Sequence, residues 1–583
     1  MAAAQGEKCC RVKKLARQMV ARLPTLEQDG RVTWRENREE EAVKMTEWTY
    51  ATQWESVAEA MAEQPAIVQQ DNIMSWREFD RAANGLADYL VKSGLRRQAK
   101  VALYARNCPE YLVGTYAAFK ASLVPFNVNY RYGNDELLYL FENGDAEAVI
   151  FETVYAERID AIRSRLPGVK RWIAIERPGV PVPAWAVSYA DIEPADTAPT
   201  GNGPRSSEDL MFIYTGGTTG MPKAVMWRQG DLIGKGGYGA NPLLGLEPMN
   251  GPEEAGARAK VMPIPVRMLI APPLMHGTGL LSAFAALSVG GTVLLNRPDH
   301  FSAIETLDMA EKWKATWMII VGQPFAQPLL DALDAEPGRW NLQSMLFFTS
   351  SGAMWNEENK RGLLSHMPQA ALMDAFSSSE ALGLGSSVMT SADTVHTAQF
   401  ALGEDCAVFD EEGQRVEPGS GVKGRVAVGG FIPMGYYKDP AKSAATFIQI
   451  EGRRWSMPGD WALVNADGSL TLLGRGSQCI NTGGEKVFPE EVEEALKRHP
   501  AVVDAAVCGM PDPRFGERVA AMASLKPGHS IDPMELIDHV RGELAHYKAP
   551  RHLLCVETVP RAPNGKMDYA EVRRQVTEAF AVS

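Results

Sequence analysis

From about residue 70 onward, apolar and polar positions alternate between helical and strand-like patterns. Residues 76–90 carry apolar side chains at helical spacing. Ser75 and Glu78 form a capping-box signature before this stripe, and Gly94 follows it as an end signal. Short apolar runs of strand length recur with helical segments between several of them, at 101–105, 124–128, 148–151, 172–175, 210–214, 292–295, 317–321 and 345–348. This alternation predicts an α/β fold in which helices flank parallel sheets.

The pattern changes past residue 420, where shorter β segments such as 424–428 and 469–473 are separated by Gly/Asp turns. Residues 489–500 then predict a helix with proline at its start, acids in the first turn, bases in the last and a closing proline. A strand at 502–507 and a turn at 511–513 continue a small α+β unit. We therefore expect a large domain of parallel sheets plus a β subdomain over 46–475, and a small mobile α+β domain over 476–583.

Two segments depart from these patterns. Residues 1–45 contain a basic stretch at 13–23 and an acidic cluster at 39–41, without the continuous apolar core of a signal peptide. We interpret them as a loosely ordered, flexible N-terminal extension, and a membrane-touching amphipathic helix is the alternative. The stretch 240–268 is rich in Gly, Pro and Glu and predicts an insertion loop.

Length and composition restrict the function further. A chain of 583 residues exceeds a single core, so two to four domains are expected. The net charge of −13 disfavours a nucleic-acid partner. The 7 cysteines are scattered without a CxxC pair, which indicates reduced thiols and a cytoplasmic setting. No apolar run reaches the ~18 residues of an integral membrane span. The composition says nothing about oligomeric state.

The stretch Tyr214–Lys223 is the strongest candidate for chemistry. Three glycines let backbone N–H groups converge on an anion, three threonines add hydroxyls, and Lys223 adds a mobile charge. The combination predicts a polyphosphate cradle. It is not a Walker A loop, because Pro222 precedes the lysine and Ala224 follows it. On its own, the stretch is equally compatible with a Gly/Thr-rich surface turn.

Six further stretches bear on this cradle. Taken singly, each has an ordinary structural interpretation as a satisfied histidine, a turn, a surface charge or a solvated loop. They are Pro273–Gly279 with His276 and Gly277, Ser350–Met354, Phe376–Glu380, Ser456–Asp460, Gly474-Arg475, and Pro560–Lys566.

Together and in this order, these stretches resemble the adenylate-forming superfamily over about residues 50–575, and most closely its AMP-forming acyl-CoA synthetases. Residues 220–228 and 474–487 are similar to the branch that handles long-chain and steroid side-chain acids. The resemblance implies a ligase that uses ATP, Mg²⁺ and coenzyme A. A carboxylic acid would be converted to acyl-AMP with release of pyrophosphate, and its acyl group would then pass to coenzyme A.

The resemblance also implies roles for individual residues. Lys566, Lys223 and Glu380 would be catalytic, with Glu380 also holding Mg²⁺, which favours oxygen ligands. Lys566 would neutralise charge between the carboxylate and the α-phosphate. ATP would be bound by Thr215, Gly216, Gly217, Thr218, Thr219, Gly220, Lys223, Gly352, Ala353, Phe376, Ser377, Ser379, Asp460 and Arg475.

For the second step, the resemblance implies a rotation of the small domain about a hinge at Ser477. The rotation would withdraw Lys566 and bring Gly483 and Gly484 to the coenzyme A site. His276 and Gly277 would border the acyl pocket. The sequence departs from the family pattern at five positions: Phe376 replaces a usual tyrosine, Ser377 a glycine and Ser379 a threonine, Ser477 replaces Asp or Lys, and Asn481 a frequent lysine. The last two leave the role of charge in the hinge and in the thioester step open.

The expected substrate is a bulky apolar carboxylic acid. Apolar residues at 280–287 and the 240–268 insertion predict a roomy apolar pocket. Long-chain, steroid side-chain, terpenoid and aryl acids all fit this description. Two other functions stay open: a ligase that loads a carrier protein, and a nucleotide- or acyl-binding protein without turnover that acts at a membrane through residues 1–45. The presence of Lys223, Glu380, Asp460 and Lys566 argues against the second.

Overall fold

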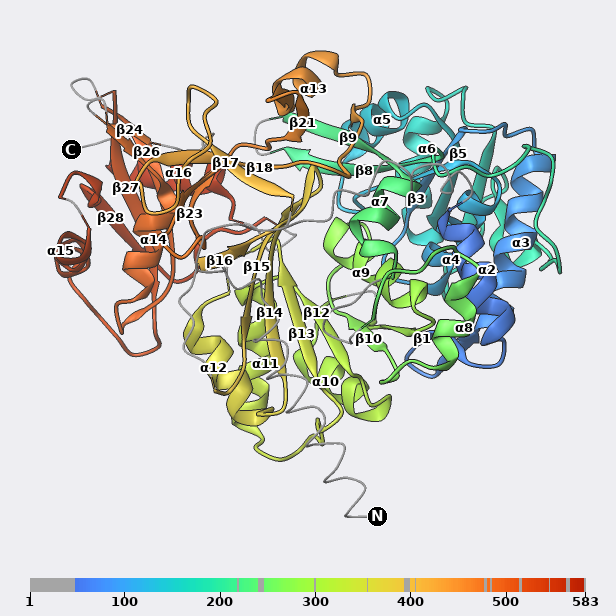
Figure 1. Ribbon diagram of the computed structural model, residues 1–583, viewed down its shortest axis with the longest axis horizontal. Helices are drawn as coiled ribbons and strands as arrows, with labels where there is room; N and C mark the ends of the chain where they lie inside the picture. Colours follow the sequence, from blue (N-terminus) through green and yellow to red (C-terminus); the bar gives the residue numbers. More distant parts are fainter. Residues whose placement is uncertain are drawn as a thin grey trace.

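The computed structural model describes residues 48–217, 220–239, 246–297, 300–353, 355–392, 399–403, 405–475, 480–482, 485–512, 516–544, 546–562 and 567–580. Three sheets organise these residues (Figure 1). The predicted α/β fold is confirmed, because all three sheets contain parallel strands joined by helical connections. The 1–45 extension lies outside the described residues.

The largest sheet has 15 strands and two halves of different character. Its first half is parallel from β1 to β14, with β2 antiparallel at the edge. In spatial order these strands are β2 (Asn72–Ser75), β1 (Pro65–Gln69), β11 (Thr292–Leu295), β10 (Arg267–Ile270), β12 (Trp317–Ile320), β13 (Phe347–Ser351) and β14 (Ala371–Ser378). The antiparallel half comprises β15 (Ala381–Met389), β16 (Gln399–Leu402), β17 (Cys406–Phe409), β18 (Lys423–Val428), β20 (Phe447–Ile450), β21 (Arg453–Ser456), β22 (Asp460–Val464) and β23 (Leu470–Arg475).

The second sheet has 8 strands, and the β8–β9 hairpin lies near its edge. The strands in spatial order are β19 (Gly435–Tyr436), β9 (Gly220–Arg228), β8 (Leu210–Gly217), β4 (Val124–Asn127), β3 (Lys100–Tyr104), β5 (Ala146–Glu152), β6 (Arg171–Ile175) and β7 (Val187–Ser188). The third sheet has 5 strands, all after residue 480: β24 (Ile480–Thr482), β25 (Glu485–Val487), β26 (Val502–Asp512), β27 (Gly516–Leu525) and β28 (His552–Val556).

Helices cover these sheets. Those of the first two sheets are α2 (Tyr50–Ala60), α3 (Trp76–Lys92), α4 (Pro109–Lys120), α5 (Asn134–Asn143), α6 (Ala156–Arg163), α7 (Gln229–Lys235), α8 (Glu254–Lys260), α9 (Gly277–Ser288), α10 (Ala303–Lys312), α11 (Gln323–Ala335), α12 (Glu357–His366) and α13 (Pro440–Thr446). The third sheet packs with α14 (Pro489–Lys497), α15 (Pro533–Glu543) and α16 (Tyr569–Phe580). We call this sheet and its three helices the C-terminal unit; it lies at one side of the molecule (Figure 1).

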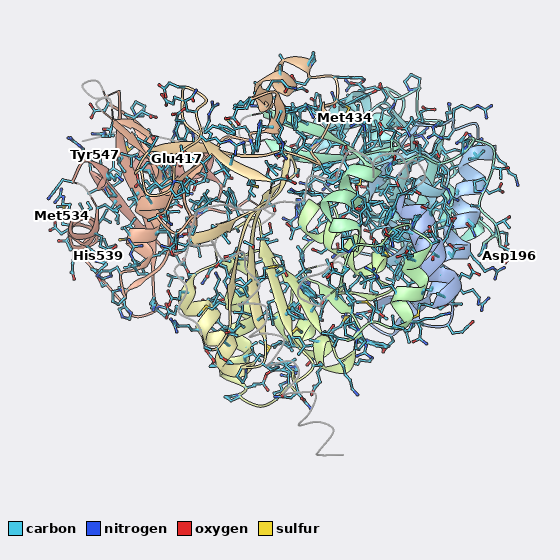
Figure 2. All side chains as sticks on the ribbon, viewed as in Figure 1. Asp196, Glu417, Met434, Met534, His539 and Tyr547 are labelled. Carbon is cyan, nitrogen blue, oxygen red and sulfur yellow. The ribbon has the colours of Figure 1, made fainter. Side chains whose placement is uncertain are left out.

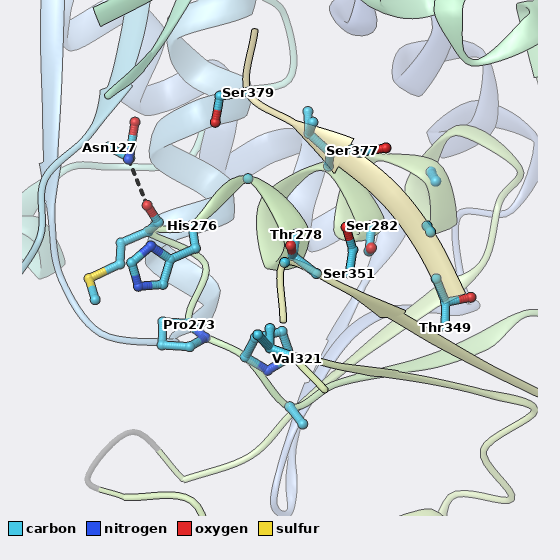
Figure 3. Close-up of a pocket in the computed structure, with 18 of the residues that line it drawn as sticks. Asn127, Pro273, His276, Thr278, Ser282, Val321, Thr349, Ser351, Ser377 and Ser379 are labelled. Carbon is cyan, nitrogen blue, oxygen red and sulfur yellow. Dashed lines mark hydrogen bonds between the residues drawn. The ribbon is translucent and has the colours of Figure 1, made fainter. Parts of the chain in front are cut away.

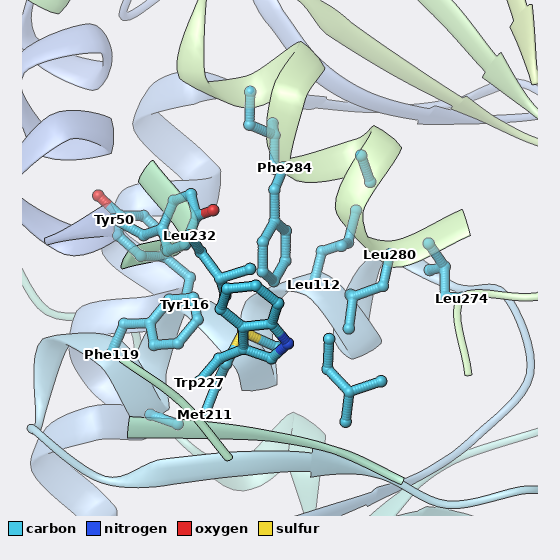
Figure 4. Close-up of a cluster of buried hydrophobic side chains, with 14 of the residues drawn as sticks. Tyr50, Leu112, Tyr116, Phe119, Met211, Trp227, Leu232, Leu274, Leu280 and Phe284 are labelled. Atoms are coloured by element: carbon cyan, nitrogen blue, oxygen red, sulfur yellow. The ribbon is translucent and has the colours of Figure 1, made fainter. Parts of the chain in front are cut away.

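One large core joins strands of the first two sheets through α2, α3, α4 and α9. Figure 4 shows its centre, where Tyr50 of α2 and Phe284 of α9 meet Phe119 of α4 and Trp227 of β9. The Tyr50 ring stacks on Phe119 with centroids 5.4 Å apart. The core therefore fixes α9 against both sheets.

Large apolar side chains such as Met434, Met534 and Tyr547 are exposed (Figure 2).

Most predicted elements are confirmed, and their ends show where local pattern is insufficient. The Ser75 hydroxyl accepts from the Glu78 amide at 3.2 Å, and Glu78 Oε2 accepts from the Ser75 amide at 2.7 Å, which completes the capping box. Gly94 adopts a φ of +89°, as expected after a helix end. The strand predicted at 345–348 begins two residues later, at Phe347. In the C-terminal unit, β26 runs through Pro511 to Asp512, past the predicted start of the turn.

The loop predicted over 240–268 is wrong in part, because α8 and the start of β10 fall inside it. The α8 helix docks on α2 by backbone approach. The Gly256 amide donates to Ser56 Oγ at 3.1 Å, and a Cβ at residue 256 would lie 2.2 Å from the Ser56 carbonyl oxygen. The close approach requires small residues in this helix. Because alanine and glycine give only a weak apolar periodicity, the sequence pattern did not predict the helix.

Candidate functional site

The predicted phosphate cradle forms the end of the β8–β9 hairpin. Thr215 pairs with Lys223 and Gly217 with Gly220, so Gly216 also lies in this ladder. Thr218 and Thr219 lie outside the described residues. The hairpin places the cradle where the second sheet faces the core helices. Its position at a strand end is where α/β proteins bind phosphates.

Lys223 is already engaged in a chain of polar contacts. Its Nζ lies 2.9 Å from Asp439 Oδ2, and this hydrogen bond holds the pKa of Asp439 below its usual range. The same Nζ lies 5.8 Å from the centroid of the Tyr436 ring. Tyr436 in turn donates its hydroxyl to Glu380 Oε1 at 2.9 Å. The structure therefore brings together Lys223 and Glu380 through a tyrosine that the sequence analysis missed.

The segment from Ser377 to Glu380 contains the end of β14 and is anchored at three points. The Trp227 indole donates to the Ser379 carbonyl at 2.9 Å, and the Ser456 hydroxyl donates to the Glu380 carbonyl at 2.6 Å. The Ser377 hydroxyl accepts from the Gly383 amide at 2.9 Å. Trp227 belongs to β9, so the strand that carries Lys223 also positions this segment.

The other predicted nucleotide residues occupy strand ends of the large sheet. Asp460, which is buried, begins β22 and pairs in register with Arg475 at the end of β23. Gly352 follows β13 with a φ of +91° and approaches Thr278 at the start of α9, while Ala353 comes next in the chain. The Phe376 ring packs on the Phe400 ring, with centroids 5.6 Å apart.

His276 occupies the N-cap position of α9 without a side-chain capping bond, and two buried asparagines hold the chain before it. Asn127 at the end of β4 donates to the carbonyls of Tyr214 and Met275 at 2.9 and 2.6 Å, and accepts from the Tyr214 amide at 2.7 Å. Figure 3 shows Asn127 beside His276. Asn107 donates to the Pro272 carbonyl at 3.1 Å and accepts from the Leu274 amide at 2.7 Å. Asn127 is the last residue of one buried strand, and Asn107 follows shortly after another. This position was the only signal in the sequence that could have identified them.

A cavity of about 820 Å³ connects these elements (Figure 3). Six predicted residues line it: Thr215, His276, Gly277, Gly352, Ser377 and Ser379. Lys223, Phe376, Glu380 and Asp460 do not line it. One face of α9 supplies Thr278, Leu281, Ser282, Ala285 and Ser288. Of residues 280–287, Leu281, Ser282 and Ala285 line the cavity, so the predicted apolar contribution of this segment is confirmed in part. Residues 246–268, the described part of the 240–268 insertion, supply none of the wall, and that expectation is wrong for them.

Several predicted residues cannot be placed. Ser477, Gly483, Gly484 and Lys566 lie outside the described residues, and for Arg475 only the backbone pairing is described. The segment before Lys566 is anchored within the C-terminal unit. Arg561 Nη2 lies 2.7 Å from Asp504 Oδ2, and Arg561 forms an isolated bridge with Met567.

Comparison with known proteins assigns this architecture to a family. A family model described as AMP-binding enzyme matches residues 54–437, and one described as AMP-binding enzyme C-terminal domain matches residues 491–566. The chain belongs to the AMP-binding enzyme family. Two solved structures share the fold of this AMP-binding enzyme. The anthranilate CoA ligase AuaEII in complex with anthranoyl-AMP has a TM-score of 0.76 at 22% identity, covering 92% of this chain and 98% of its own. ATP-bound MatB from Rhodopseudomonas palustris has a TM-score of 0.75 at 23% identity, covering 91% and 100%.

Closer relatives are named CoA ligases. A medium/long-chain-fatty-acid--CoA/3-oxocholest-4-en-26-oate--CoA ligase of Mycolicibacterium smegmatis is 38% identical over 88% of this chain and 94% of its own. A 3-oxocholest-4-en-26-oate--CoA ligase of Rhodococcus rhodochrous is 37% identical over 89% and 94%.

The residues of the AMP-binding enzyme fit a nucleotide and a metal held between protein and phosphate. Ser378 Oγ is buried and has no hydrogen-bond partner among the described residues, although Ser378 lines the cavity. Among those same residues, no three His, Cys, Asp or Glu side chains gather to hold a metal. A Mg²⁺ ion beside Glu380 would therefore take most of its oxygen ligands from phosphate and water, its usual preference in nucleotide enzymes.

Proposed function

We propose that this AMP-binding enzyme, an acyl-CoA ligase that works through acyl-AMP, activates a long-chain, steroid side-chain or other bulky apolar carboxylic acid. The cavity is the observation that supports the proposal. It joins Thr215 of the cradle and Ser377 and Ser379 to the face of α9 that carries Leu281 and Ala285. The phosphates and the acid can therefore meet in one space, and this proximity is what attack on the α-phosphorus requires.

In the first half-reaction, a carboxylate oxygen forms a bond to the α-phosphorus, and pyrophosphate leaves with the electrons of the broken P–O bond. Lys223 and the cradle from Thr215 to Gly220 would hold the β- and γ-phosphates. Lys223 would exchange its contact with Asp439 for a phosphate oxygen. Glu380 would hold Mg²⁺, which neutralises phosphate charge, and Lys566 would neutralise charge at the reacting oxygens.

The remaining proposed contacts hold the nucleoside. Phe376 would stack on adenine, and Gly352 with Ala353 would line its pocket. Asp460 would accept hydrogen bonds from the ribose hydroxyls, with Arg475 paired beside it in the ladder. Ser377 and Ser379 would present hydroxyls between nucleotide and acid. His276 and Gly277 would border the acyl carboxylate, where the asparagine contacts fix the chain.

In the second half-reaction, the thiol of coenzyme A attacks the acyl carbon and AMP leaves. We assign residues 46–475 to the adenylating domain and 476–583 to a mobile domain that turns about Ser477. Gly483 and Gly484 would then meet coenzyme A. The sheet composition supports this division, because the second half of the large sheet ends at Arg475 and the third sheet begins at Ile480.

The acid class rests on the cavity wall and on the relatives. The wall includes the apolar side chains of Leu232, Ile233, Leu281, Val289, Phe301 and Phe325. Relatives at 37–38% identity bear the names of fatty-acid and cholestenoate CoA ligases. In the parts of the chain that the structure describes, no helix combines the length and apolar character needed to cross a bilayer. Because the stretch at 13–23 is basic, the proposal includes contact of this segment with a membrane surface.

The test is AMP release by the purified protein with ATP, Mg²⁺ and a panel of fatty, steroid side-chain, terpenoid and aryl acids, with and without coenzyme A. We expect AMP release that needs both acid and coenzyme A, with the highest kcat/KM for a bulky apolar acid. Acyl-AMP that accumulates regardless of coenzyme A would exclude thioester formation and favour a carrier protein. No acid-dependent AMP from any acid would favour a binding protein without turnover.

A further inference from the structure

The α9 helix gives the cavity a measurable length. Its wall residues run from Gly277 at the first helical position to Ser288 at the last. At 1.5 Å per residue, this separation is about 16 Å along the helix axis. The end at Gly277 lies beside the predicted nucleotide residues, since a Cβ at Gly277 would meet Ser379 Oγ at 3.7 Å. The end at Ser288 is therefore the end remote from the reacting carboxylate.

Two side chains of α2 complete this remote end, Tyr50 and Gln53. Gln53 is 1% exposed, and its Nε2 donates to the Ser288 carbonyl at 3.1 Å. The neighbouring Trp54 indole donates to Ser288 Oγ, also at 3.1 Å. Ser288 is thus held through both of its oxygens. The Gln53 amide has one orientation, because exchanging its oxygen and nitrogen would set two acceptors against each other.

That orientation leaves the other half of the amide unused. Gln53 Oε1 is buried and accepts no hydrogen bond from any residue that the structure describes. The surroundings are aromatic, with the Tyr50 ring packed on Phe119 and on Phe284 at 4.9 Å. A buried acceptor without a donor is costly, and native proteins contain few of them. At a cavity wall, the missing donor can belong to a ligand.

We propose that Gln53 Oε1 accepts a hydrogen bond from a hydroxyl group of the substrate, at the end of the acid remote from its carboxylate. This inference rests on the proposed function and narrows its substrate class to long apolar acids that carry a distal hydroxyl. It makes Gln53 a specificity-determining residue. A ketone at the same place has no hydrogen to donate, so it would leave the amide oxygen unpaired just as an unsubstituted acid does.

The first test compares matched acids on the full-length enzyme. ω-Hydroxy and unsubstituted fatty acids over a series of chain lengths, and steroid side-chain acids with a ring hydroxyl or a ring ketone, are assayed for kcat/KM. We expect a preference of about tenfold or more for the hydroxyl form of at least one skeleton, mainly through KM, because the hydroxyl pairs a buried acceptor that the other acids leave unpaired. Equal values throughout, or a preference for the ketone, would overturn the inference.

Variants identify the residue. Gln53→Met keeps the volume of the side chain and removes both the acceptor and the donor to the Ser288 carbonyl, so the ratio of kcat/KM between hydroxylated and unsubstituted acids should fall to about one. Gln323→Met is the matched control, because Gln323 Oε1 is also buried and unpaired among the described residues but Gln323 does not line the cavity. A preference that survives Gln53→Met, or is lost in Gln323→Met, would overturn the assignment.

Direct binding separates this inference from the proposed function. Calorimetric titration of the wild type with hydroxylated and unsubstituted acids should show the same ratio in Kd, even if no acid supports AMP release. Absence of turnover with a retained Kd ratio would count against the ligase reaction alone. Turnover without any Kd ratio would count against the Gln53 site alone. Thermal unfolding of each variant verifies that it is folded.

Discussion

Tyr436 donates its phenolic hydrogen to Glu380 Oε1 across 2.9 Å, while its ring lies 5.8 Å from Lys223 Nζ. It does so from β19, which pairs with the strand that carries Lys223. One side chain thus contacts the two groups that we assign to Mg²⁺ and to the terminal phosphates. The bond occupies one carboxylate oxygen of Glu380, and the other oxygen would be the one to bind Mg²⁺ in the proposed reaction. Tyr436 is therefore a positioning residue for Glu380.

Tyr436→Phe should weaken the binding of Mg²⁺ at Glu380, because the hydroxyl that holds Glu380 is lost. Lys223 should stay in place, because the aromatic ring remains. A hydrogen bond of this kind contributes ~1 kcal/mol, so we expect the Mg²⁺ concentration for half-maximal adenylation to rise about fivefold to tenfold. Tyr437→Phe is the control, because the Tyr437 hydroxyl bonds to Asp145 instead. An unchanged Mg²⁺ dependence in Tyr436→Phe would contradict the role.

Asn127→Ala should cost both stability and activity. Asn127 is buried and makes three hydrogen bonds that join β4, the cradle strand and the chain before His276. Its removal leaves two carbonyls and one amide unpaired, and each such group costs ~1–3 kcal/mol unless water enters. We expect destabilisation of a few kcal/mol in denaturant unfolding and a higher KM for both ATP and acid. Asn127→Asp keeps the acceptor for the Tyr214 amide but sets a buried carboxylate oxygen against the two carbonyls, so it should be no more stable than Asn127→Ala at neutral pH. Equal stability in all three proteins would show that the bridge is unimportant.

The sequence predicted elements well where the determining interactions are local. The Ser75–Glu78 box, the α14 helix and strands such as β3, β5, β11 and β12 follow from periodicity and end signals. The sequence also indicated the chemistry, because the residues of the cradle follow one another in the chain, and so do those of the Glu380 segment. It did not predict Tyr436, Asn127 or Gln53, whose partners lie 56, 148 and 235 positions away. Such contacts depend on the packing of distant elements, and the residues themselves fit any surface or core.

The buried Glu493 makes the C-terminal unit sensitive to pH. Val507 N and Tyr569 Oη donate to its Oε1 at 2.9 and 3.0 Å, and burial raises the pKa of this carboxyl to about 7. Between the ordinary pKa near 4.5 and this value, the folded state binds more protons than the unfolded state. The contribution of Glu493 to stability is therefore largest at low pH and falls as pH rises through this interval.

Glu493→Gln should remove that dependence, since an amide oxygen can accept both hydrogen bonds without charge. We expect the free energy of unfolding of the variant to exceed that of the wild type by up to roughly 3 kcal/mol at pH 8 and to match it near pH 5. Thermal unfolding at the two pH values measures the difference. Glu571→Gln on α16 serves as the control, because Arg574 lowers the pKa of Glu571 to about 2 and its titration lies below this range. A variant less stable than the wild type at pH 8 would contradict the direction.

Lys566→Ala should cripple adenylation far more than thioester formation from supplied acyl-AMP, because the lysine is assigned to the first half-reaction alone. Single-turnover pyrophosphate release and conversion of supplied acyl-AMP by coenzyme A measure the two steps separately. Equal losses in both would refute the assignment to one step and the domain rotation that separates them.

The anchor of the Lys566 segment gives a subtler version of the same test. Asp504 on β26 binds the Arg561 guanidinium at 2.7 Å, and Arg561 bridges to Met567, so one ion pair holds the chain on both sides of Lys566. Asp504→Asn weakens this anchor without touching the lysine, and a small misplacement of a reacting group costs tenfold or more in rate. We expect adenylation to slow roughly tenfold while conversion of supplied acyl-AMP is unchanged. Asp538→Asn, which breaks an exposed pair with Arg541 on α15, should change neither. A uniform loss in both half-reactions of Asp504→Asn would indicate a folding defect of the C-terminal unit instead of a misplaced lysine.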